Sequence, residues 1–289
     1  MNPESLLQHF ERISEAPDAI PRLRRFILDL AVRGKLMEQA PNDESAAELL
    51  KRIEAEKARM VKIGVLRKEK PLPAVAIDEV PFSVPLGWEL VRLASLCGLE
   101  NGDRSKNYPS RDELVADGIP FINAGHLEAG EVRLDDMNCI TQQRFDMLNS
   151  GKIRDGDILF CLRGSLGKTA LVSGLAQGAI ASSLVIIRLA GHLSVRFMLS
   201  YLSSPLAFEM IKRFDNGTAQ PNLSSADLGK FVVPLPPLAE QHRIVARVDE
   251  LMALCDQLEA QLTTTAADSR CLLEAVLHEA LAPALEETV

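Results

Sequence analysis

The last quarter of the chain carries a long, regular alternation of apolar and polar positions. Nothing interrupts a helix from Leu238 to Leu262, and the apolar positions step by four and three residues, as along a coiled-coil seam. The seam positions are Ile244, Val248, Leu251, Cys255, Leu258 and Leu262, and Leu272 and Val276 resume the pattern. The sequence therefore predicts a long helix covered by a second helix. Packing of this face against the chain's own domain is the alternative.

Helical periodicity also marks the N-terminal part, with helices expected at residues 3–15 and 20–37 and a third beginning at Ser45. Ser45-Ala-Ala-Glu48 has the form of a capping box, in which both side chains satisfy amides at the helix start. Between Lys51 and Lys70 there are eight basic and three acidic residues. This excess fits a solvated helix face, or a strip facing phosphates.

Residues 88–238 hold short β-branched or aliphatic runs separated by Gly, Asn and Ser. Strands are expected at residues 120–123, 157–161, 169–172 and 183–188, and helices at 110–117, 194–203 and 206–214. Trp88 follows a proline-rich linker and is expected to anchor the core at the domain entrance. The predicted fold class is α+β, one globular mixed domain flanked by long helices that form a coiled-coil scaffold. Its divisions are a helical scaffold at 1–80, the globular domain at 81–237 and a coiled-coil helix at 238–289.

The net charge of −8 is unevenly distributed. Residues 1–80 are balanced, residues 81–238 carry −1, and residues 239–289 carry −7. The acidic helix is expected to contact protein, whereas nucleic-acid binding by the middle segment would rest on local basic clusters. Five scattered cysteines without a Cys-x-x-Cys pair favour free thiols in a reducing cytoplasm. We expect no signal peptide and no membrane span.

Several enzymatic sites are excluded by their missing residues. Leu162 stands where a phosphate-binding loop ending in Gly167-Lys168-Thr169 needs its first glycine, and Arg163 where a nucleophile elbow needs one. No lysine has Asp or Glu two residues before it, which removes a common nuclease pattern. The five histidines share no metal-ligand spacing. A non-catalytic protein without a metal site is therefore predicted.

Three stretches resemble the specificity subunits of type I restriction–modification systems. The longest is Pro234-Leu-Pro-Pro-Leu-Ala-Glu-Gln-His-Arg-Ile-Val245, followed by Asp249-Glu-Leu-Met-Ala-Leu-Cys-Asp-Gln-Leu-Glu259. The helical runs at 23–36 and 47–59 and the segment Pro85-Leu-Gly-Trp-Glu-Leu-Val-Arg-Leu93 are similar to the family's conserved helical region and the opening of a target-recognition domain. The resemblance covers nearly the whole chain, although ordinary members have two recognition domains and this chain has one.

Four loops carry residues suited to reading DNA, because their Gly and Ser let the backbone approach a groove while Arg, Lys, Asn and Gln meet bases or phosphates. The last three resemble recurring segments of target-recognition domains. The candidate contacts are Asn101, Arg104 and Lys106 in the first loop, Asn123 and His126 in the second, Arg163, Ser165, Lys168 and Thr169 in the third, and Thr218, Gln220, Asn222 and Ser224 in the fourth. Ordinary turn chemistry is the alternative for each loop.

The resemblance implies a DNA-binding specificity subunit without activity of its own. Its expected partners are double-stranded DNA, a DNA adenine methyltransferase subunit and an ATP-driven restriction subunit. S-adenosylmethionine, Mg²⁺ and ATP would belong to those partners. One recognition domain covers too few base pairs to single out sites in a genome, so a homodimer through the helical seam and an interrupted palindromic target are expected. The alternatives are half of a heteromer, or an assembly or inhibitor protein without base readout.

Overall fold

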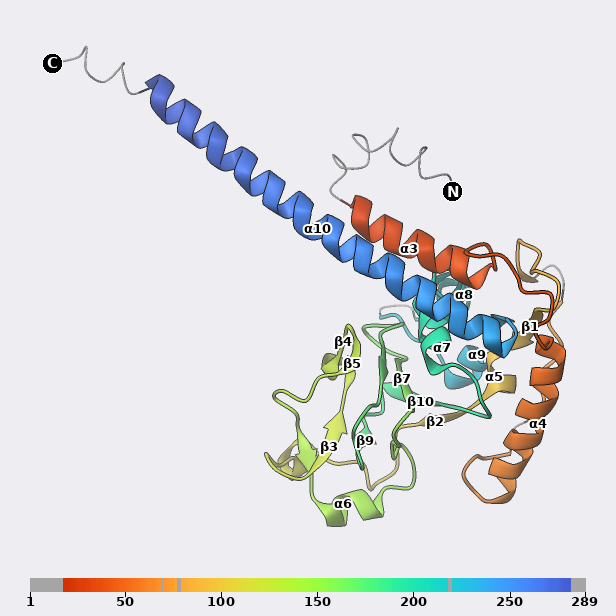
Figure 1. Ribbon diagram of the computed structural model, residues 1–289. Helices are drawn as coiled ribbons and strands as arrows, with labels where there is room; N and C mark the ends of the chain where they lie inside the picture. The colour runs from red at the N-terminus through yellow and green to blue at the C-terminus, as the bar shows by residue number, and fades with distance from the viewer. Residues whose placement is uncertain (1–17, 69, 77–78, 218–219, 282–289) are drawn as a thin grey trace. The chain divides into compact units, whose positions relative to one another are not determined.

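The computed structural model describes residues 18–68, 70–76, 79–217 and 220–281 (Figure 1). The helix expected at 3–15 lies outside these residues. The chain divides into two compact units, Leu28–Ala246 and the pair of segments Met1–Ile27 and Arg247–Val289. Each unit is described by itself. The sequence-based divisions at 80/81 and 237/238 stay a prediction about functional parts.

A six-stranded sheet organises the larger unit, with strand order β2-β10-β7-β8-β5-β4. The strands are β2 (Cys97–Asn101), β10 (Leu184–Leu189), β7 (Ile158–Cys161), β8 (Thr169–Leu171), β5 (Gly130–Val132) and β4 (Leu127–Glu128). The strands expected at 157–161, 169–172 and 183–188 are confirmed to within a residue or two. β2, β4 and β5 were not predicted from the sequence, because these strands are short or interrupted by glycine and polar residues.

Both faces of the central strands β7 and β10 are buried, which explains why β7 is apolar throughout. Ile158 and Phe160 point into a core shared with Val185 and Ile187 of β10 and with the helices. Leu159 and Cys161 point into a second core on the other face. The domain is therefore mixed α/β, as expected from its sequence.

A smaller three-stranded sheet has the order β6-β3-β9, with β6 (Cys139–Ile140), β3 (Ile119–Ile122) and β9 (Ala179–Ile180), and shares a core with α6 (Gln142–Met147). The helix expected at 110–117 is wrong in extent, since only a 3₁₀ turn, η2 (Arg111–Glu113), forms there. Glu113 does accept a hydrogen bond from the Ser110 amide (2.8 Å). Val115 instead pairs with Cys139 through its backbone, which ends the helix.

Besides α6, the α-helices that lie wholly within the described part of this unit are α4 (Ala46–Lys62), α5 (Leu93–Leu96), α7 (Val195–Leu202), α8 (Pro205–Phe214) and α9 (Ser225–Gly229). Ser194 and Ser204 accept hydrogen bonds at the starts of α7 and α8, as good N-caps do. The capping box expected at Ser45 is wrong, since the Ser45 side chain makes no such bond. α4 buries Leu49 and Ile53 in the main core. It is thus an integral part of the globular unit.

The entrance and exit of the domain are joined by a two-stranded antiparallel sheet of β1 (Glu89–Arg92) and β11 (Val232–Leu235). Just before β1, Trp88 is 5% exposed and donates its indole N–H to Glu240 Oε2 (2.9 Å). Trp88 is therefore a core anchor, as expected. The first turn of α10 (Leu238–Leu281) is held further by Gln241 Oε1, which accepts from the Ser194 amide (3.0 Å).

Glu240→Gln is expected to stabilise the fold increasingly as pH rises. Burial raises the pKa of Glu240, with smaller opposing effects from Trp88 and Arg243. A carboxyl whose pKa is higher in the folded state binds its proton more tightly there. Its ionisation therefore lowers the stability of the fold as the pH rises above the pKa that the group has in the unfolded chain. Glutamine keeps an acceptor for Trp88 without that cost. Urea unfolding of both proteins at pH 5 and pH 8 tests this, and a stability difference independent of pH would contradict it.

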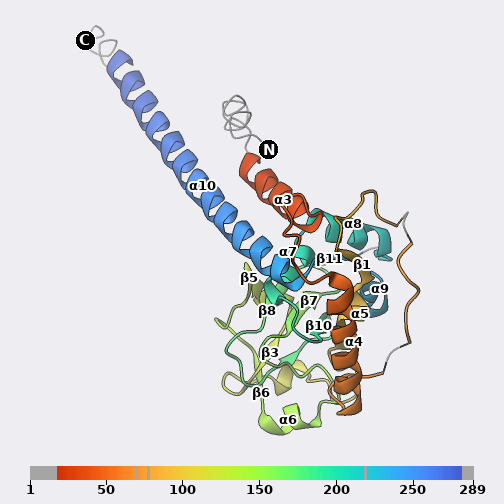
Figure 2. The ribbon, with the colours of Figure 1, turned by 45° about the vertical axis from the view of Figure 1, so that its right-hand side comes forward.

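The smaller unit contains the start of α3 (Ala19–Val32) and most of α10. Arg24 joins them through ion pairs with Asp256 (2.7 Å) and Glu259 (2.8 Å), and both views show these segments alongside each other (Figures 1 and 2). α3 ends earlier than expected, because Gly34 adopts φ +66° and its amide bonds back to Ala31. A second helix therefore does lie beside part of the α10 seam.

The seam positions of α10 differ in burial. Ile244, Val248 and Cys255 are buried, whereas Leu251, Leu258 and Leu262 are half-buried. Further along, Leu272, Leu273, Val276 and Leu277 are each at least 50% exposed. The long helix is confirmed, and its outer apolar positions have no cover within the described chain.

Candidate nucleic-acid interface

Two of the four candidate loops leave the same edge of the six-stranded sheet. β10 pairs Val185 with Asn101 of β2 and Leu184 with Cys161 of β7, while β7 pairs Phe160 with Thr169 of β8. The last residues of β2 and β7 and the first residues of β10 and β8 therefore lie side by side. The loops at 101–107 and 163–169 both begin at this edge, so residues about 60 positions apart in the sequence become neighbours.

The loop at 216–224 packs against the loop at 163–169. Arg163 Nε donates to Asn222 Oδ1 (3.0 Å), and Asn222 Nδ2 donates to Asn216 Oδ1 (2.9 Å). The Asp215 carboxylate accepts from the amides of Gly217 (3.0 Å) and Asn222 (2.9 Å), and these hydrogen bonds lower the pKa of Asp215. The oxygen and the nitrogen of the Asn222 side-chain amide are thus both hydrogen-bonded. Asn222 orients the exposed Arg163 guanidinium.

The first loop is attached to the same group by Asn101, whose Nδ2 donates to Ser225 Oγ (2.9 Å). Within the loop, buried Asp103 accepts from the amides of Ser105 and Asn149 (both 2.6 Å). Although burial acts to raise the pKa of Asp103, these bonds hold it below its ordinary value. This frame leaves Lys106 and Arg104 exposed, and Arg104 donates to the Ser182 carbonyl (3.2 Å).

The second loop uses its polar side chains internally. Asn123 Oδ1 accepts from the Gly125 amide (2.8 Å), and His126 Nδ1 accepts from the Asn123 amide (3.1 Å). His126 is 6% exposed, and burial lowers its pKa, which favours the neutral ring. These bonds shape the turn before β4, and a DNA contact by Asn123 or His126 stays a prediction.

The β4–β5 hairpin lies next to the third loop. Its two-residue turn holds Ala129 at φ +50° and Gly130 at φ +83°, the left-handed conformation that tight hairpins need. A hollow of ≈ 450 Å³ lies between this turn, Lys168 and Arg133. Sequence reasoning missed Arg133, because the hairpin is only a few residues long and Ala-Gly is a weak turn signal.

The remaining candidates separate by exposure. Ser165, Lys168 and Gln220 are exposed, whereas Thr169 is half-buried, and Thr218 lies outside the described residues. Ser224 caps α9 by accepting from the Asp227 amide (3.0 Å). Arg104, Lys106, Arg163, Ser165, Lys168 and Gln220 therefore form the exposed polar set of the loops, to which the structure adds Arg133.

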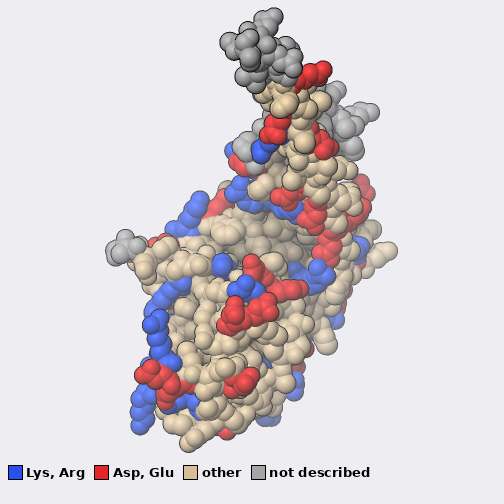
Figure 3. All heavy atoms as spheres, turned by 90° about the vertical axis from the view of Figure 1, so that its left-hand side faces the viewer, with Lys and Arg blue, Asp and Glu red and all other residues tan. Residues whose placement is uncertain are grey.

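The basic side chains of the globular part are gathered in places and do not cover its surface evenly (Figure 3). In Figure 3 basic side chains follow one margin of the globular part, while acidic and basic side chains mix at its centre. Among the described residues no group of three or more His, Cys, Asp or Glu side chains could hold a metal ion. Nor is any helix in the described ranges long and apolar enough to cross a membrane.

Comparison with known proteins identifies the relatives of this chain. The EcoAI type I restriction enzyme specificity subunit of Escherichia coli is 31% identical over 97% of this chain and 49% of its own length. The EcoEI specificity subunit of the same species is 29% identical with the same coverage. The chain thus spans about half the length of these curated relatives.

Solved structures agree in fold. The HsdS subunit of Thermoanaerobacter tengcongensis superposes with a TM-score of 0.52 at 22% identity, covering 96% of this chain and 57% of that one. Residues 85–266 match the family model described as the type I restriction modification DNA specificity domain. This match includes all four candidate loops and the start of α10. The chain belongs to the type I restriction–modification DNA specificity family.

Proposed function

We propose that this chain is a sequence-specific DNA-binding specificity subunit of a type I restriction–modification complex. One observation carries the proposal. The residues matched by the family model include loops that meet at one edge of the six-stranded sheet, and these loops expose several cationic side chains. Such side chains can grip phosphates and reach base edges. The unit that includes residues 81–237 would read DNA, and the helices at 1–80 and 238–289 would contact partner proteins.

The chain would direct other subunits and carry no activity or cofactor of its own. A DNA adenine methyltransferase subunit would bring S-adenosylmethionine, and a restriction subunit would bring Mg²⁺ and ATP. The complex would act in the cytoplasm. Support comes from the relatives, which are named as specificity subunits of restriction enzymes.

Expression with and without this chain tests the function. A host that carries the methyltransferase partner should gain methylated adenines at one recurring sequence only when this chain is present. The purified chain alone should transfer no methyl group from labelled S-adenosylmethionine and should leave DNA uncut. Methylation that is identical with and without the chain would refute the specificity role, and methyl transfer by the isolated chain would refute its non-catalytic character.

Arg163→Ala and Lys168→Ala should have different effects on binding. If Arg163 grips a guanine edge, its loss should cost roughly 1–3 kcal/mol at one base position and relax the sequence preference there. If Lys168 grips phosphate, its loss should weaken all sequences alike and reduce the salt slope by about one ion. Competition binding against single-base variants at several salt concentrations separates the two. Wild-type behaviour of both variants would make the 163–169 loop purely structural.

Asn222 supplies a matched control for Arg163. Asn222→Ala removes the acceptor for Arg163 Nε and leaves the guanidinium itself in place. Asn222→Ala should relax the sequence preference in the same direction as Arg163→Ala, but by a smaller amount. An assembly or inhibitor protein without base readout, the alternative function, would show no sequence preference in any of these proteins.

We also propose that two copies pair through the outer part of α10. Its four large apolar side chains from Leu272 to Leu277 are exposed in one chain, and a second copy related by a two-fold axis would cover them. Such a dimer would read the same half-site twice, so its target would be an interrupted palindrome. A complex with a different second specificity chain would instead give an asymmetric target.

A further inference from the structure

A second hollow of the globular unit lies apart from the β4–β5 turn. It is lined by the segment after α4 (Gly64–Arg67), by β2 residues Gly98–Asn101 and by parts of the segment 149–154. Its volume is ≈ 530 Å³, within the range of sites for small ligands. Four basic residues and one carboxylate line it, namely Arg67, Lys152, Arg154, Arg188 and Glu100.

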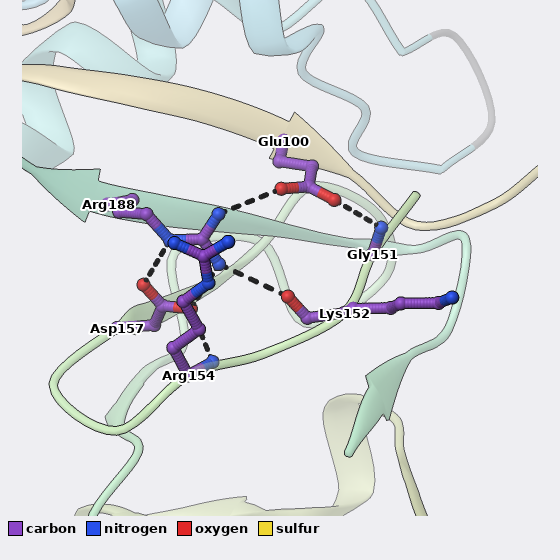
Figure 4. Close-up of polar contacts among 6 residues, drawn as sticks. All are labelled: Glu100, Gly151, Lys152, Arg154, Asp157 and Arg188. Atoms are coloured by element: carbon purple, nitrogen blue, oxygen red, sulfur yellow. Dashed lines mark hydrogen bonds and ion pairs between the residues drawn. The ribbon is translucent and has the colours of Figure 1, made fainter. Parts of the chain in front are cut away.

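One wall is a fixed and neutralised guanidinium. Arg188 Nε and Nη2 donate to the two oxygens of Asp157 (2.9 and 2.6 Å), Nη1 donates to Glu100 Oε2 (3.0 Å), and Nη2 also donates to the Lys152 carbonyl (3.1 Å) (Figure 4). These bonds hold the Asp157 and Glu100 carboxylates against Arg188. Arg188 thus builds the wall and has little capacity left for a ligand.

Two other guanidinium groups are available. Arg67 and Arg154 are exposed, line the hollow, and form no ion pair within the described chain. In Figure 4 the Arg154 side chain extends from its loop toward Arg188. Lys152 differs, since its ammonium donates to the Asp146 carbonyl (3.3 Å) and lies over the Phe145 ring. The planar fork of N–H donors on a guanidinium matches the oxygens of a phosphate. Arg67 and Arg154, which form no ion pair within the described chain, therefore favour a phosphate ligand.

One residue of the lining, Asn101, carries an unpaired acceptor. Asn101 Oδ1 is buried and has no hydrogen-bond partner in the described chain, while its Nδ2 is held by Ser225 Oγ. A buried acceptor without a donor is costly, so a site with this atom favours a ligand that brings an N–H or O–H. Phosphate and donor together are the features of a nucleotide.

We propose that this hollow binds a nucleotide unit, with its phosphate on Arg67 and Arg154 and a donor group toward Asn101 Oδ1. The nucleotide could belong to a DNA strand or be free. Continuity with the 101–107 loop favours DNA, because a Cβ at Gly151 would stand only 2.8 Å from Gly102 Cα, so these two backbones are in direct contact. The DNA source rests on the proposed function, whereas a free nucleotide does not.

The test compares Arg67→Gln/Arg154→Gln with Lys62→Gln/Lys68→Gln. Both double variants remove two exposed positive charges, and the control pair lies near the hollow but outside its lining. The full chain is titrated with deoxyadenosine monophosphate and with inorganic pyrophosphate by calorimetry. Its affinity for duplex DNA is measured from 50 to 200 mM salt. Thermal unfolding confirms that all proteins are folded.

For a DNA source, the hollow variant should flatten the dependence of log K on log salt by about 0.9 per lost contact, or roughly 1.8 in total, beyond any change in the control. For a free nucleotide, the monophosphate should bind at least tenfold more weakly to the hollow variant, with the DNA slope equal to that of the control. Asn101→Ala should weaken the monophosphate more than pyrophosphate. Equal behaviour of hollow and control variants in both assays would overturn the proposal. Absence of DNA binding by the wild type would refute the proposed function, and the monophosphate titration would still decide the hollow.

Discussion

Arg188→Met is expected to lower the free energy of unfolding by about 3–5 kcal/mol, the usual cost of removing one partner from a buried ion pair. The Arg188 and Asp157 side chains are 8% and 4% exposed, so water cannot replace the lost guanidinium. Asp157 would remain buried with only the Arg154 amide as a donor (2.8 Å). Glu100 would keep its bond from the Gly151 amide (2.7 Å) and some exposure.

The pH dependence and a double variant distinguish this cause from lost packing. Burial already raises the pKa of Asp157, and loss of Arg188 would raise it further, so the variant should lose less stability at pH 5 than at pH 8. Asp157→Asn in the Arg188→Met background should recover most of the loss by removing the uncompensated charge. Arg154→Met, at an exposed neighbouring position, should change stability little. Urea unfolding measures all four proteins, and a loss independent of pH and of Asp157→Asn would contradict the ion-pair explanation.

Leu272→Glu combined with Val276→Glu is expected to separate the proposed dimer into monomers. The two side chains are 68% and 53% exposed in one chain, so the substitutions should leave the folded monomer intact. In a two-fold dimer each would lose roughly 1.5–3 kcal/mol of apolar burial, once in each copy. Light scattering over a range of protein concentrations would show the change in mass.

The control for this experiment is Thr263→Glu with Ala267→Glu. At 3.6 residues per turn these exposed positions lie on roughly the opposite side of α10 from Leu272 and Val276. They add the same charge to the same helix and should leave the dimer in place. Leu251→Glu and Leu258→Glu are less informative, because both leucines are already half-buried within the chain. A monomeric wild type, or an unchanged mass of the Leu272 and Val276 variant, would refute pairing through this surface.

The local elements of this fold were largely accessible from sequence, because their signals are short-range. Apolar steps of three and four residues predicted α10, and continuous apolar runs predicted β7 and β10. Where the prediction was wrong, a distant partner decided the structure. The segment at 110–117 has a helical start, yet pairing of Val115 with Cys139 draws its backbone into an extended form.

Loop composition predicted which segments carry polar side chains more reliably than which of those side chains are exposed. Asn123, His126, Asn222 and Ser224 have the residue types of a polar binding surface, but each bonds within its own loop or an adjacent one. Short polar side chains satisfy nearby backbone groups whenever the turn geometry allows it. The longer Arg163 and Lys168 side chains extend past these bonds, so their exposure followed from length as well as from position.

The sequence by itself determined the family, through the resemblance of long segments to known members. It also determined the long C-terminal helix, the mixed domain and the loops that carry its polar residues, since these depend on spacing along the chain. Only the tertiary structure decided that the loops at 163–169 and 216–224 share one network, that Arg133 and Lys168 line one hollow, and that Arg188 pairs with both Asp157 and Glu100. These groups come from segments tens of residues apart. Sheet register and helix packing bring them together, and neither can be read from local periodicity.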